Sequence, residues 1–144
     1  MGAVSVDQIL VTLLKRIPLA EGDVLHGMKY NDTGYVDFGE AYFSVINAGA
    51  IKAWKRHLRM TLNFVVPIGK VHFVFVDDQG RVRQELAGAD RYVRLTIPPG
   101  IWFGFRGQND PYSLLMNLAD IPHDPAEIQR KGIDEICFDW DKKL

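Results

Sequence analysis

The sequence predicts an all-β fold of the sandwich or barrel class, and three observations support this prediction. Apolar and polar residues alternate with a period of two over short segments, as in strands that bury one face. Turn residues separate these segments at intervals of roughly 8–12 residues. Strands do not alternate with helical segments. A chain of 144 residues is about one domain long, so we expect a single domain over residues 1–144.

The expected strands begin at residue 41 and are joined by short turns. Asn47-Ala48-Gly49 separates the first two strands, and Pro98-Pro99-Gly100 breaks the chain before the last two. One or two helical turns are expected after Asp124, an N-cap residue type that precedes Pro125 at the first helical position. Residues 6–14 fit a helix or a strand. The strands are expected at 41–47, 50–57, 60–67, 70–77, 81–86, 91–97, 101–105 and 112–118.

The composition is that of an ordinary globular protein and argues against two classes of partner. Nucleic-acid binding needs an excess of Lys and Arg on one face, whereas the net charge here is -1 and basic residues are interspersed with acidic ones. The apolar run near the N-terminus is far shorter than the ~20 residues that cross a bilayer. The single cysteine, Cys137, forms no intramolecular disulfide. We therefore expect a cytoplasmic protein that binds neither nucleic acid nor membrane.

Two spacings in the chain resemble the motifs of cupin barrels. Gly49 is followed by five residues and then by Lys55-Arg56-His57, where the first motif has His-x-His, and Gly69 closes the hairpin at the expected distance. The segment from Pro98 to Phe103 is similar to the second motif, Pro-x-Gly-x-x-His, except at the histidine. The resemblance implies a jelly-roll β-barrel, also called a double-stranded β-helix.

The same positions predict that no metal ion is bound. The positions that would supply ligands in a cupin hold Lys55, His57, Leu62 and Phe103 in this chain. A mononuclear transition-metal site needs about three protein donors. Of these four side chains only the histidine offers a lone pair at neutral pH. We therefore expect a barrel that works without a metal or another cofactor.

Longer segments resemble the deoxysugar-nucleotide 3,5-epimerases, the dTDP-4-dehydrorhamnose 3,5-epimerase family of metal-free cupins. The resemblance covers most of the chain and rests on the order and spacing of its segments. It implies an epimerase or isomerase of deoxysugar or surface-polysaccharide biosynthesis that binds a nucleotide-sugar. It also implies a homodimer, to which residues 1–20 would contribute a strand arm. The segments are Gly22–His26, Gly39–Ser44, Ile51–Lys55, Ile97–Phe105 and Asp134–Trp140.

The family's chemistry implies roles for particular positions. Its members use a histidine to remove the proton beside a sugar ketone, a tyrosine to return a proton, an aspartate to orient the histidine and a cation on the oxyanion. The family segment Leu-Arg-Gly-Leu-His reads Ile51-Lys52-Ala53-Trp54-Lys55 here. Lys52 thus falls at the arginine that contacts phosphate or oxyanion, and Lys55 falls at the base.

His57 and Lys55 are both candidates for the base. They lie two residues apart, which in a strand puts them on one face, opposite Lys52, Trp54 and Arg56. His57 is otherwise a hydrogen-bonded core or rim residue. Lys55 is a base if burial lowers its pKa, and otherwise a lysine that meets a diphosphate or solvent.

The tyrosine and the aspartate of the family are not matched at their expected places. The tyrosine is expected near Leu115-Met116-Asn117, where none occurs. The aspartate is expected near Gly132-Ile133, and only a slip of one residue would bring in Asp134. Phe103 replaces the supporting histidine. The fold signal is therefore stronger than the signal for catalysis.

Further polar and aromatic residues are candidates for substrate binding. Cations on neighbouring strands would hold the two phosphates of a nucleotide-sugar, or they form a solvated sheet face. His72 competes with His57 for proton transfer, and Trp54 and Trp102 are candidates for stacking on a base or sugar. Asn63 and Asn117 lie inside apolar strands and need either a hydrogen-bonded network or a ligand. The cations are Lys52, Lys55, Arg56, Arg59 and Lys70.

Two functional hypotheses follow from these residues. The first is an epimerase or isomerase that removes a proton beside the ketone of a nucleotide-linked 4-keto-deoxysugar. His57 or Lys55 would be its base, and Lys52 or Arg56 would hold the enolate or the phosphates. The alternative is a catalytically degenerate cupin that binds a nucleotide-sugar or serves as a structural, accessory dimer module, because the tyrosine, the aspartate and the second histidine are unmatched.

Overall fold

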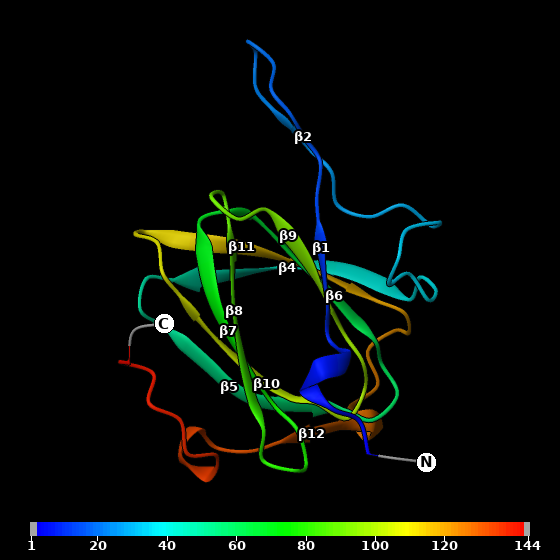
Figure 1. The fold of residues 1–144 in the computed structure, drawn as a ribbon, viewed down its shortest axis with the longest axis vertical. Coiled ribbons are helices and arrows are strands. Elements are labelled where there is room, and N and C mark those ends of the chain that lie inside the picture. Colours follow the sequence, from blue (N-terminus) through cyan, green and yellow to red (C-terminus); the bar gives the residue numbers. More distant parts are fainter. Residues whose placement is uncertain (1–2, 143–144) are drawn as a thin grey trace.

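Two antiparallel sheets packed face to face form the body of the protein. The computed structural model describes residues 3–142. The first sheet has the strand order β1-β9-β6-β11-β4 and the second β12-β5-β10-β7-β8. Figure 1 shows the two sheets curving around the interior, with β2 and β3 projecting from one end. This architecture confirms the predicted all-β, jelly-roll class. The strands are β1 (Leu10–Leu13), β2 (Arg16–Ile17), β3 (Val24–Leu25), β4 (Glu40–Asn47), β5 (Ile51–His57), β6 (Leu62–Ile68), β7 (Lys70–Val76), β8 (Val82–Gly88), β9 (Val93–Ile97), β10 (Trp102–Gly107), β11 (Tyr112–Ala119) and β12 (Ile128–Arg130).

The two-residue period of the sequence produces two apolar layers on either side of the second sheet. In β7, Phe73 and Phe75 point into the space between the sheets, where Phe73 stacks on Phe64 of β6 with ring centroids 5.3 Å apart. The alternate residues Val74 and Val76 lie on the outer face. The C-terminal segment covers this outer face with aromatic side chains such as Trp140. Side-chain direction along β7 and β10 therefore decides which residues can reach the interior.

The segments of ambiguous prediction form short 3₁₀ turns followed by strands. Within residues 6–14, η1 (Val6–Gln8) precedes β1. After Asp124, whose carboxylate accepts a hydrogen bond from the Ala126 amide, η2 (Pro125–Glu127) makes one turn before β12. A third such turn, η3, spans Ile133–Glu135. Within residues 3–142, no helix has both the length and the apolar character needed to cross a membrane.

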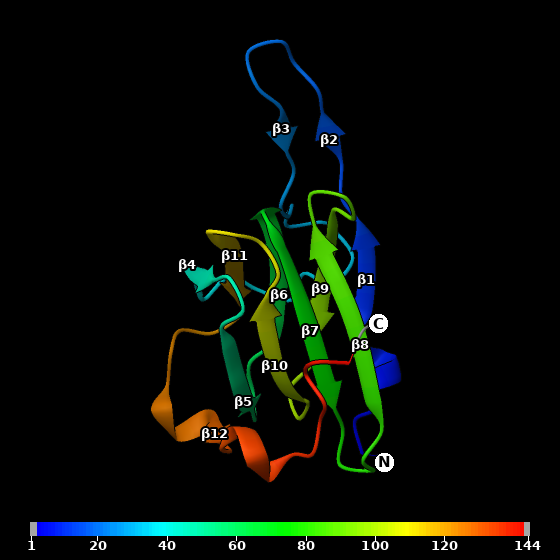
Figure 2. The same ribbon diagram turned by 90° about the vertical axis from the view of Figure 1, so that its left-hand side faces the viewer.

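One side of the barrel is closed by the N-terminal segment. The buried carboxylate of Asp77 accepts a hydrogen bond from the Val6 amide at 3.1 Å. The Arg83 guanidinium donates to the carbonyls of Val6 and Ile9 at 2.9 and 3.0 Å. Figure 2 shows β1 and β8 on this side and β4, β5 and β12 on the opposite side. The interior is therefore reached from the side of β4, β5 and β12.

Candidate active site between the two sheets

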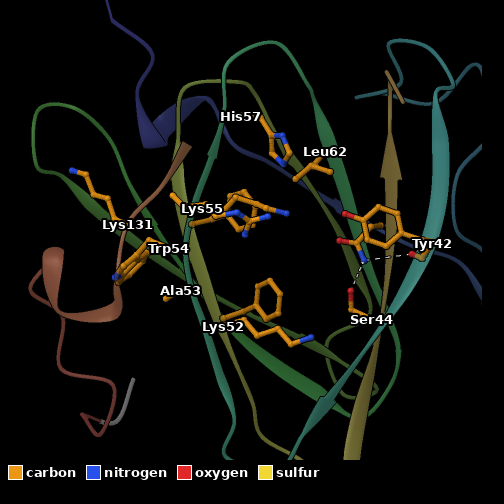
Figure 3. A pocket seen from close by; sticks show the side chains of 13 residues that line it. Tyr42, Ser44, Lys52, Ala53, Trp54, Lys55, His57, Leu62 and Lys131 are labelled. Carbon is orange, nitrogen blue, oxygen red and sulfur yellow. Dashed lines mark hydrogen bonds between the residues drawn. The ribbon is translucent and has the colours of Figure 1, made fainter. Parts of the chain in front are cut away.

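A cavity of about 400 Å³ opens between β4 of the first sheet and β5 of the second. Figure 3 shows Lys52, Lys55 and His57 entering it from one wall, with Tyr42 and Ser44 on the other wall. Asn117 of β11 lies on the same wall as Tyr42, because the two residues are partners in the register of β11 and β4. The apolar side chains that also line the cavity include Leu62, Phe103 and Phe105.

An irregularity in β5 brings both lysines into the cavity. The register between β10 and β5 runs from Phe103 opposite Lys55 to Gly104 opposite Ala53, so Trp54 is an extra residue. Such a bulge reverses the alternation of side chains along the strand. Lys52, which strict alternation predicts on the face opposite Lys55 and His57, therefore lines the same cavity. This corrects that part of the prediction, whereas Trp54 does pack on the outer face.

His57 is paired with a buried carboxylate that the sequence analysis did not identify. Its Nδ1 lies 2.5 Å from Oε2 of Glu127, and the two side chains are only 4% and 2% exposed. The other carboxylate oxygen, Oε1, accepts hydrogen bonds from the amides of Met60 at 2.9 Å and Arg59 at 3.3 Å. The turn after β5 therefore fixes Glu127, and Glu127 fixes the imidazole ring.

The protonation of this pair leaves a basic nitrogen in the site. Burial lowers the pKa of His57, and the hydrogen bond with Glu127 opposes this effect without reversing it. Burial alone would raise the pKa of Glu127, but hydrogen bonds from His57 and from the Met60 amide lower it below its ordinary value. A neutral imidazole that donates Nδ1–H to an ionised carboxylate has an unprotonated Nε2. This Nε2 atom is buried and has no hydrogen-bond partner within residues 3–142.

The opposite wall carries a phenol. Tyr42 is 38% exposed on the edge strand β4, and its ring faces the cavity in Figure 3. Burial, followed by the negative charge of Glu40, raises the pKa of Tyr42 above its ordinary value. The phenol therefore keeps its proton over the neutral pH range and can donate it.

Positive charge surrounds the space between His57 and Tyr42. Lys52, Lys55 and Arg130 of β12 all line the cavity. Burial lowers the pKa of Lys55, and the charge of Arg130 lowers it further. Among the residues that the structure describes, the Lys52 ammonium makes one long contact, 3.5 Å, with the carbonyl of Val45. Cations placed in this way attract an anionic ligand such as a phosphate ester.

Two candidates for substrate binding lie on the outer face of the second sheet instead. Arg56 forms an ion pair with Asp78 at 2.8 Å and hydrogen bonds with Gln129, which satisfies its guanidinium away from the cavity. Trp102 is 6% exposed and lies beneath two cations, with Arg56 Cζ at 4.6 Å and Lys131 Nζ at 4.7 Å from the ring centroid. Its ring is therefore covered and does not line the cavity.

Four further candidates are also placed elsewhere. Arg59 is exposed and pairs with Asp124, and Lys70 pairs with Asp90. His72 lies on the outer face of β7, where its Nε2 is 2.9 Å from the Gln84 side chain. Asn63 lies on the outer face of β6 and bonds Thr96 and the Gly34 carbonyl. In each case strand alternation or an exposed turn directs the side chain away from the interior. Of the ten candidates, the cavity gathers Lys52, Lys55, His57 and Asn117.

Two residues that line this cavity, Tyr42 and Arg130, and one that contacts His57 behind it, Glu127, were missed by the sequence reasoning. Glu127 follows the N-cap signal at Asp124, but nothing in the sequence pairs it with β5, about 70 residues earlier. Tyr42 belongs to an alternating aromatic strand and reads as a core residue. Arg130 lies in a strand of three residues, too short to be recognised. Asp134, the alternative aspartate, lies in η3 and does not line the cavity.

No group of three or more His, Cys, Asp or Glu side chains that could hold a metal ion occurs within residues 3–142. Of the positions corresponding to cupin ligands, His57 is engaged with Glu127, and Leu62 and Phe103 contribute carbon atoms to the cavity wall. The donor set thus does not fit a transition metal.

Several known proteins resemble this chain in sequence or in fold. No family model matches the sequence. A solved structure of a dTDP sugar isomerase from Desulfovibrio desulfuricans G20 is 36% identical, with a TM-score of 0.90 over 96% of this chain and 94% of that chain. The Haloferax volcanii protein "Probable low-salt glycan biosynthesis epimerase Agl13" is 28% identical over 120 residues, 76% of this chain and 77% of that protein.

A more distant structure shares the fold. The dTDP-4-dehydrorhamnose 3,5-epimerase from Sulfolobus tokodaii has a TM-score of 0.82 at 18% identity, over 99% of this chain and 86% of that chain. At this level of identity the likeness concerns the barrel and not the residues that line it.

Proposed function

Since the chain belongs to the family of dTDP-sugar isomerases and dTDP-4-dehydrorhamnose 3,5-epimerase-like proteins, we propose that it acts on a nucleotide-linked 4-keto-deoxysugar. The reaction is an epimerisation or isomerisation that begins with removal of the proton next to the ketone, in deoxysugar or surface-polysaccharide biosynthesis. The observation that carries this proposal is the buried His57–Glu127 pair: Nε2 of His57 has no hydrogen-bond partner within residues 3–142, and His57 lines a cavity that Tyr42 and Lys55 also line.

The proposed mechanism uses the two walls of the cavity in sequence. Nε2 of His57 takes the proton from the carbon beside the ketone, and the electron pair of the C–H bond moves to the carbonyl oxygen as an enolate. The ammonium of Lys55 stabilises this negative charge. The phenol of Tyr42 then returns a proton to the carbon as the enolate collapses to the ketone, and solvent restores both side chains.

The geometry favours inversion at the reacting carbon. His57 is on β5 and Tyr42 is on β4, so the base and the acid reach the sugar from opposite walls. A proton that leaves one face and returns to the other inverts the configuration.

Two residues near the cavity are proposed for the roles that have no match in the sequence. Glu127 would orient the histidine in place of the aspartate, because it contacts His57 Nδ1, and Tyr42 would act as the tyrosine from the strand next to the expected one, opposite Asn117 in register. These placements support the enzyme over the degenerate binding barrel. Phe103, which replaces the second histidine, is 6.0 Å from the His57 ring and stacks on it, so that position serves packing.

Deuterium uptake from solvent tests the proposal. Nucleotide-linked 4-keto-6-deoxysugars are incubated in D₂O with the native protein, with His57→Gln and with His72→Gln. His72 provides a matched control, because it is an equally buried histidine of the same sheet that faces away from the cavity. We expect uptake with the native and His72→Gln proteins and a loss on the order of 10²–10⁴-fold in His57→Gln.

One outcome would count against the assigned base and another against the enzyme itself. Equal uptake by all three proteins would show that His57 is not the base. If the native protein binds the nucleotide-sugar in a thermal-shift titration but incorporates no deuterium, the accessory binding barrel would replace the proposed function.

We also propose that the protein is a homodimer. Figure 2 shows β2 and β3 as a hairpin that stands clear of the barrel, and an isolated two-stranded hairpin is marginally stable in water. Leu13 and Leu19 near it are 85% and 51% exposed, and Phe43 and Val45 on the edge strand β4 are 62% and 54% exposed. Apolar surface and an open strand edge of this kind favour pairing with a second copy.

A further inference from the structure

The side-chain amide of Asn117 is a polar group inside the apolar interior of the barrel. Asn117 is 5% exposed, lines the cavity and lies opposite Tyr42 in the register of β11 and β4. A buried amide costs free energy unless its donors and acceptors find partners. The hydrogen-bond partners of the amide nitrogen and of the amide oxygen therefore indicate whether the residue is structural or binds a ligand.

The nitrogen of this amide is satisfied by the protein. Nδ2 lies 3.1 Å from the hydroxyl oxygen of Ser44 and 3.4 Å from the main-chain carbonyls of both Tyr42 and Leu115. Carbonyl oxygens only accept hydrogen bonds, so the amide atom that faces them has to be the nitrogen. Its two hydrogens are used by this group of acceptors, and the orientation of the amide is fixed.

The oxygen of the amide has no such partner. Within residues 3–142 no group donates a hydrogen bond to Oδ1 of Asn117. Within the same residues, three buried side-chain atoms have neither solvent contact nor a hydrogen-bond partner: His57 Nε2, Arg94 Nε and Trp140 Nε1. Oδ1 of Asn117 is not one of them, so it is accessible. Because Asn117 lines the cavity, we infer that Oδ1 faces the cavity.

We propose that Oδ1 of Asn117 accepts a hydrogen bond from a ring hydroxyl of the sugar, and that the site thereby selects sugars that keep a hydroxyl on the reacting carbon or next to it. This inference rests on the proposed function. An amide oxygen only accepts, so its partner is a donor such as a hydroxyl. Tyr42 on the same wall sets the position, because its phenol delivers the proton to the reacting carbon.

The surroundings of Asn117 strengthen this selection. Leu62, Phe103 and Phe105 line the cavity nearby and offer no polar atom to a ligand. A buried acceptor that is left without a partner costs more than the gain from making an ordinary hydrogen bond. A site of this kind rejects an analogue that lacks the donor far more strongly than its size would require.

Ligand affinity in matched variants tests the proposal. The ligands are dTDP-4-keto-6-deoxyglucose and its 2-fluoro and 3-fluoro analogues, since fluorine keeps nearly the size of the hydroxyl and removes the donated hydrogen. Kd is measured by calorimetry in a His57→Gln background, which prevents turnover. With Asn117 present, we expect one fluoro analogue to bind about 10- to 100-fold more weakly than the hydroxyl ligand.

Variants of Asn117 and of its partner separate the two ends of the amide. Asn117→Leu, of similar size, should abolish the difference between the hydroxyl and fluoro ligands. Ser44→Ala removes a partner of Nδ2 only and should retain the difference. Thermal unfolding of each variant, measured without ligand, shows whether the barrel is intact.

The outcomes distinguish this inference from the proposed function. If the hydroxyl ligand binds and the native protein exchanges deuterium, but the fluoro analogues bind equally well or Asn117→Leu leaves the difference unchanged, only the role of Asn117 is overturned. If the hydroxyl ligand does not bind at all, the proposed function and the inference are both overturned.

Discussion

Tyr42 and His57 perform separable steps in the proposed reaction, because they lie on different strands and on opposite walls of the cavity. In Tyr42→Phe the base and its carboxylate partner are untouched, so we expect deuterium uptake from solvent to continue. Formation of the inverted product should fall about 10²-fold or more, since no positioned acid remains on the second face. Chromatography of the product and mass spectrometry of the recovered substrate measure the two steps.

A parallel loss of both signals in Tyr42→Phe would contradict this separation of roles. Tyr112→Phe provides a matched control, because Tyr112 is 41% exposed at the start of β11 and does not line the cavity. It should leave both deuterium uptake and product formation at the native level.

The pH dependence of the exchange rate should reveal His57 and Lys55. His57 acts as the free base, and burial lowers its pKa, so the rate should fall only as the pH drops below the ordinary histidine value of about 6.5. Lys55 acts as the cation, and burial lowers its pKa as well. The rate should therefore fall again on the alkaline side, at a pH below the ordinary lysine value of about 10.4.

Lys55→Arg identifies the alkaline limb of this profile. A guanidinium keeps its charge above pH 12, so the alkaline limb should move to higher pH while the acid limb stays in place. Rates measured between pH 5 and pH 11 give the profile. An alkaline limb that does not move in Lys55→Arg would assign it to a group other than Lys55.

At the scale of elements, strand pattern predicted the barrel but could not predict which side chains share the cavity. The sequence of β7 shows its alternation of inward and outward side chains, and several such strands in succession predict a barrel. The bulge at Trp54 is one extra residue against β10, and the sequence of β5 alone does not reveal its partner. For the same reason Lys52 was predicted on the wrong face.

Contacts between residues that are distant in sequence could not be predicted either. Glu127 approaches His57 because β12 pairs with β5, with Ile128 opposite His57. A three-residue strand carries almost no periodicity, and its partner lies far away in sequence. The family's order of motifs puts the base at Lys55, two residues before the proposed base His57. It could not show that a glutamate and a tyrosine approach this strand from different elements.

The hairpin of β2 and β3 is the element on which the proposed dimer depends. The His26 amide donates to the Lys15 carbonyl at 3.0 Å, so the two ends of the hairpin are already adjacent. Residues 16–25 can therefore be replaced by an Asn-Gly turn with little effect on the barrel. We expect the native protein to sediment as a dimer and this variant as a monomer at micromolar concentration.

The hairpin variant is informative only if its barrel is folded. Its thermal unfolding should remain cooperative, and the far-ultraviolet circular dichroism should lose only the signal of a short hairpin. Native and shortened proteins of the same oligomeric state would contradict the proposal that this arm mediates dimerisation.

At the scale of the whole molecule, buried ionisable groups lie on both sides of the barrel. Asp77 fastens the N-terminal segment on the closed side, and the His57–Glu127 pair joins β12 to β5 on the open side. Burial alone would raise the pKa of Asp77, but hydrogen bonds from the amides of Val6 and Arg81 and the charge of Arg81 bring it below the ordinary value. Asp77, His57 and Glu127 therefore make the stability of the barrel depend on pH.

The free energy of unfolding should decrease in two stages as the pH falls. Burial lowers the pKa of His57 and His72 in the folded protein. Below about pH 6.5 these histidines therefore bind protons in the unfolded chain but not in the folded chain, and the free energy of unfolding declines. Asp77 and Glu127 also have lowered pKa values, so a second decline begins below about pH 4.3, where unfolded carboxylates become protonated. Urea unfolding at a series of pH values measures both stages. His72→Gln should weaken the first stage and Asp77→Asn the second, whereas stability that is constant from pH 8 to pH 5 would show that the two histidines are not buried as the structure has them.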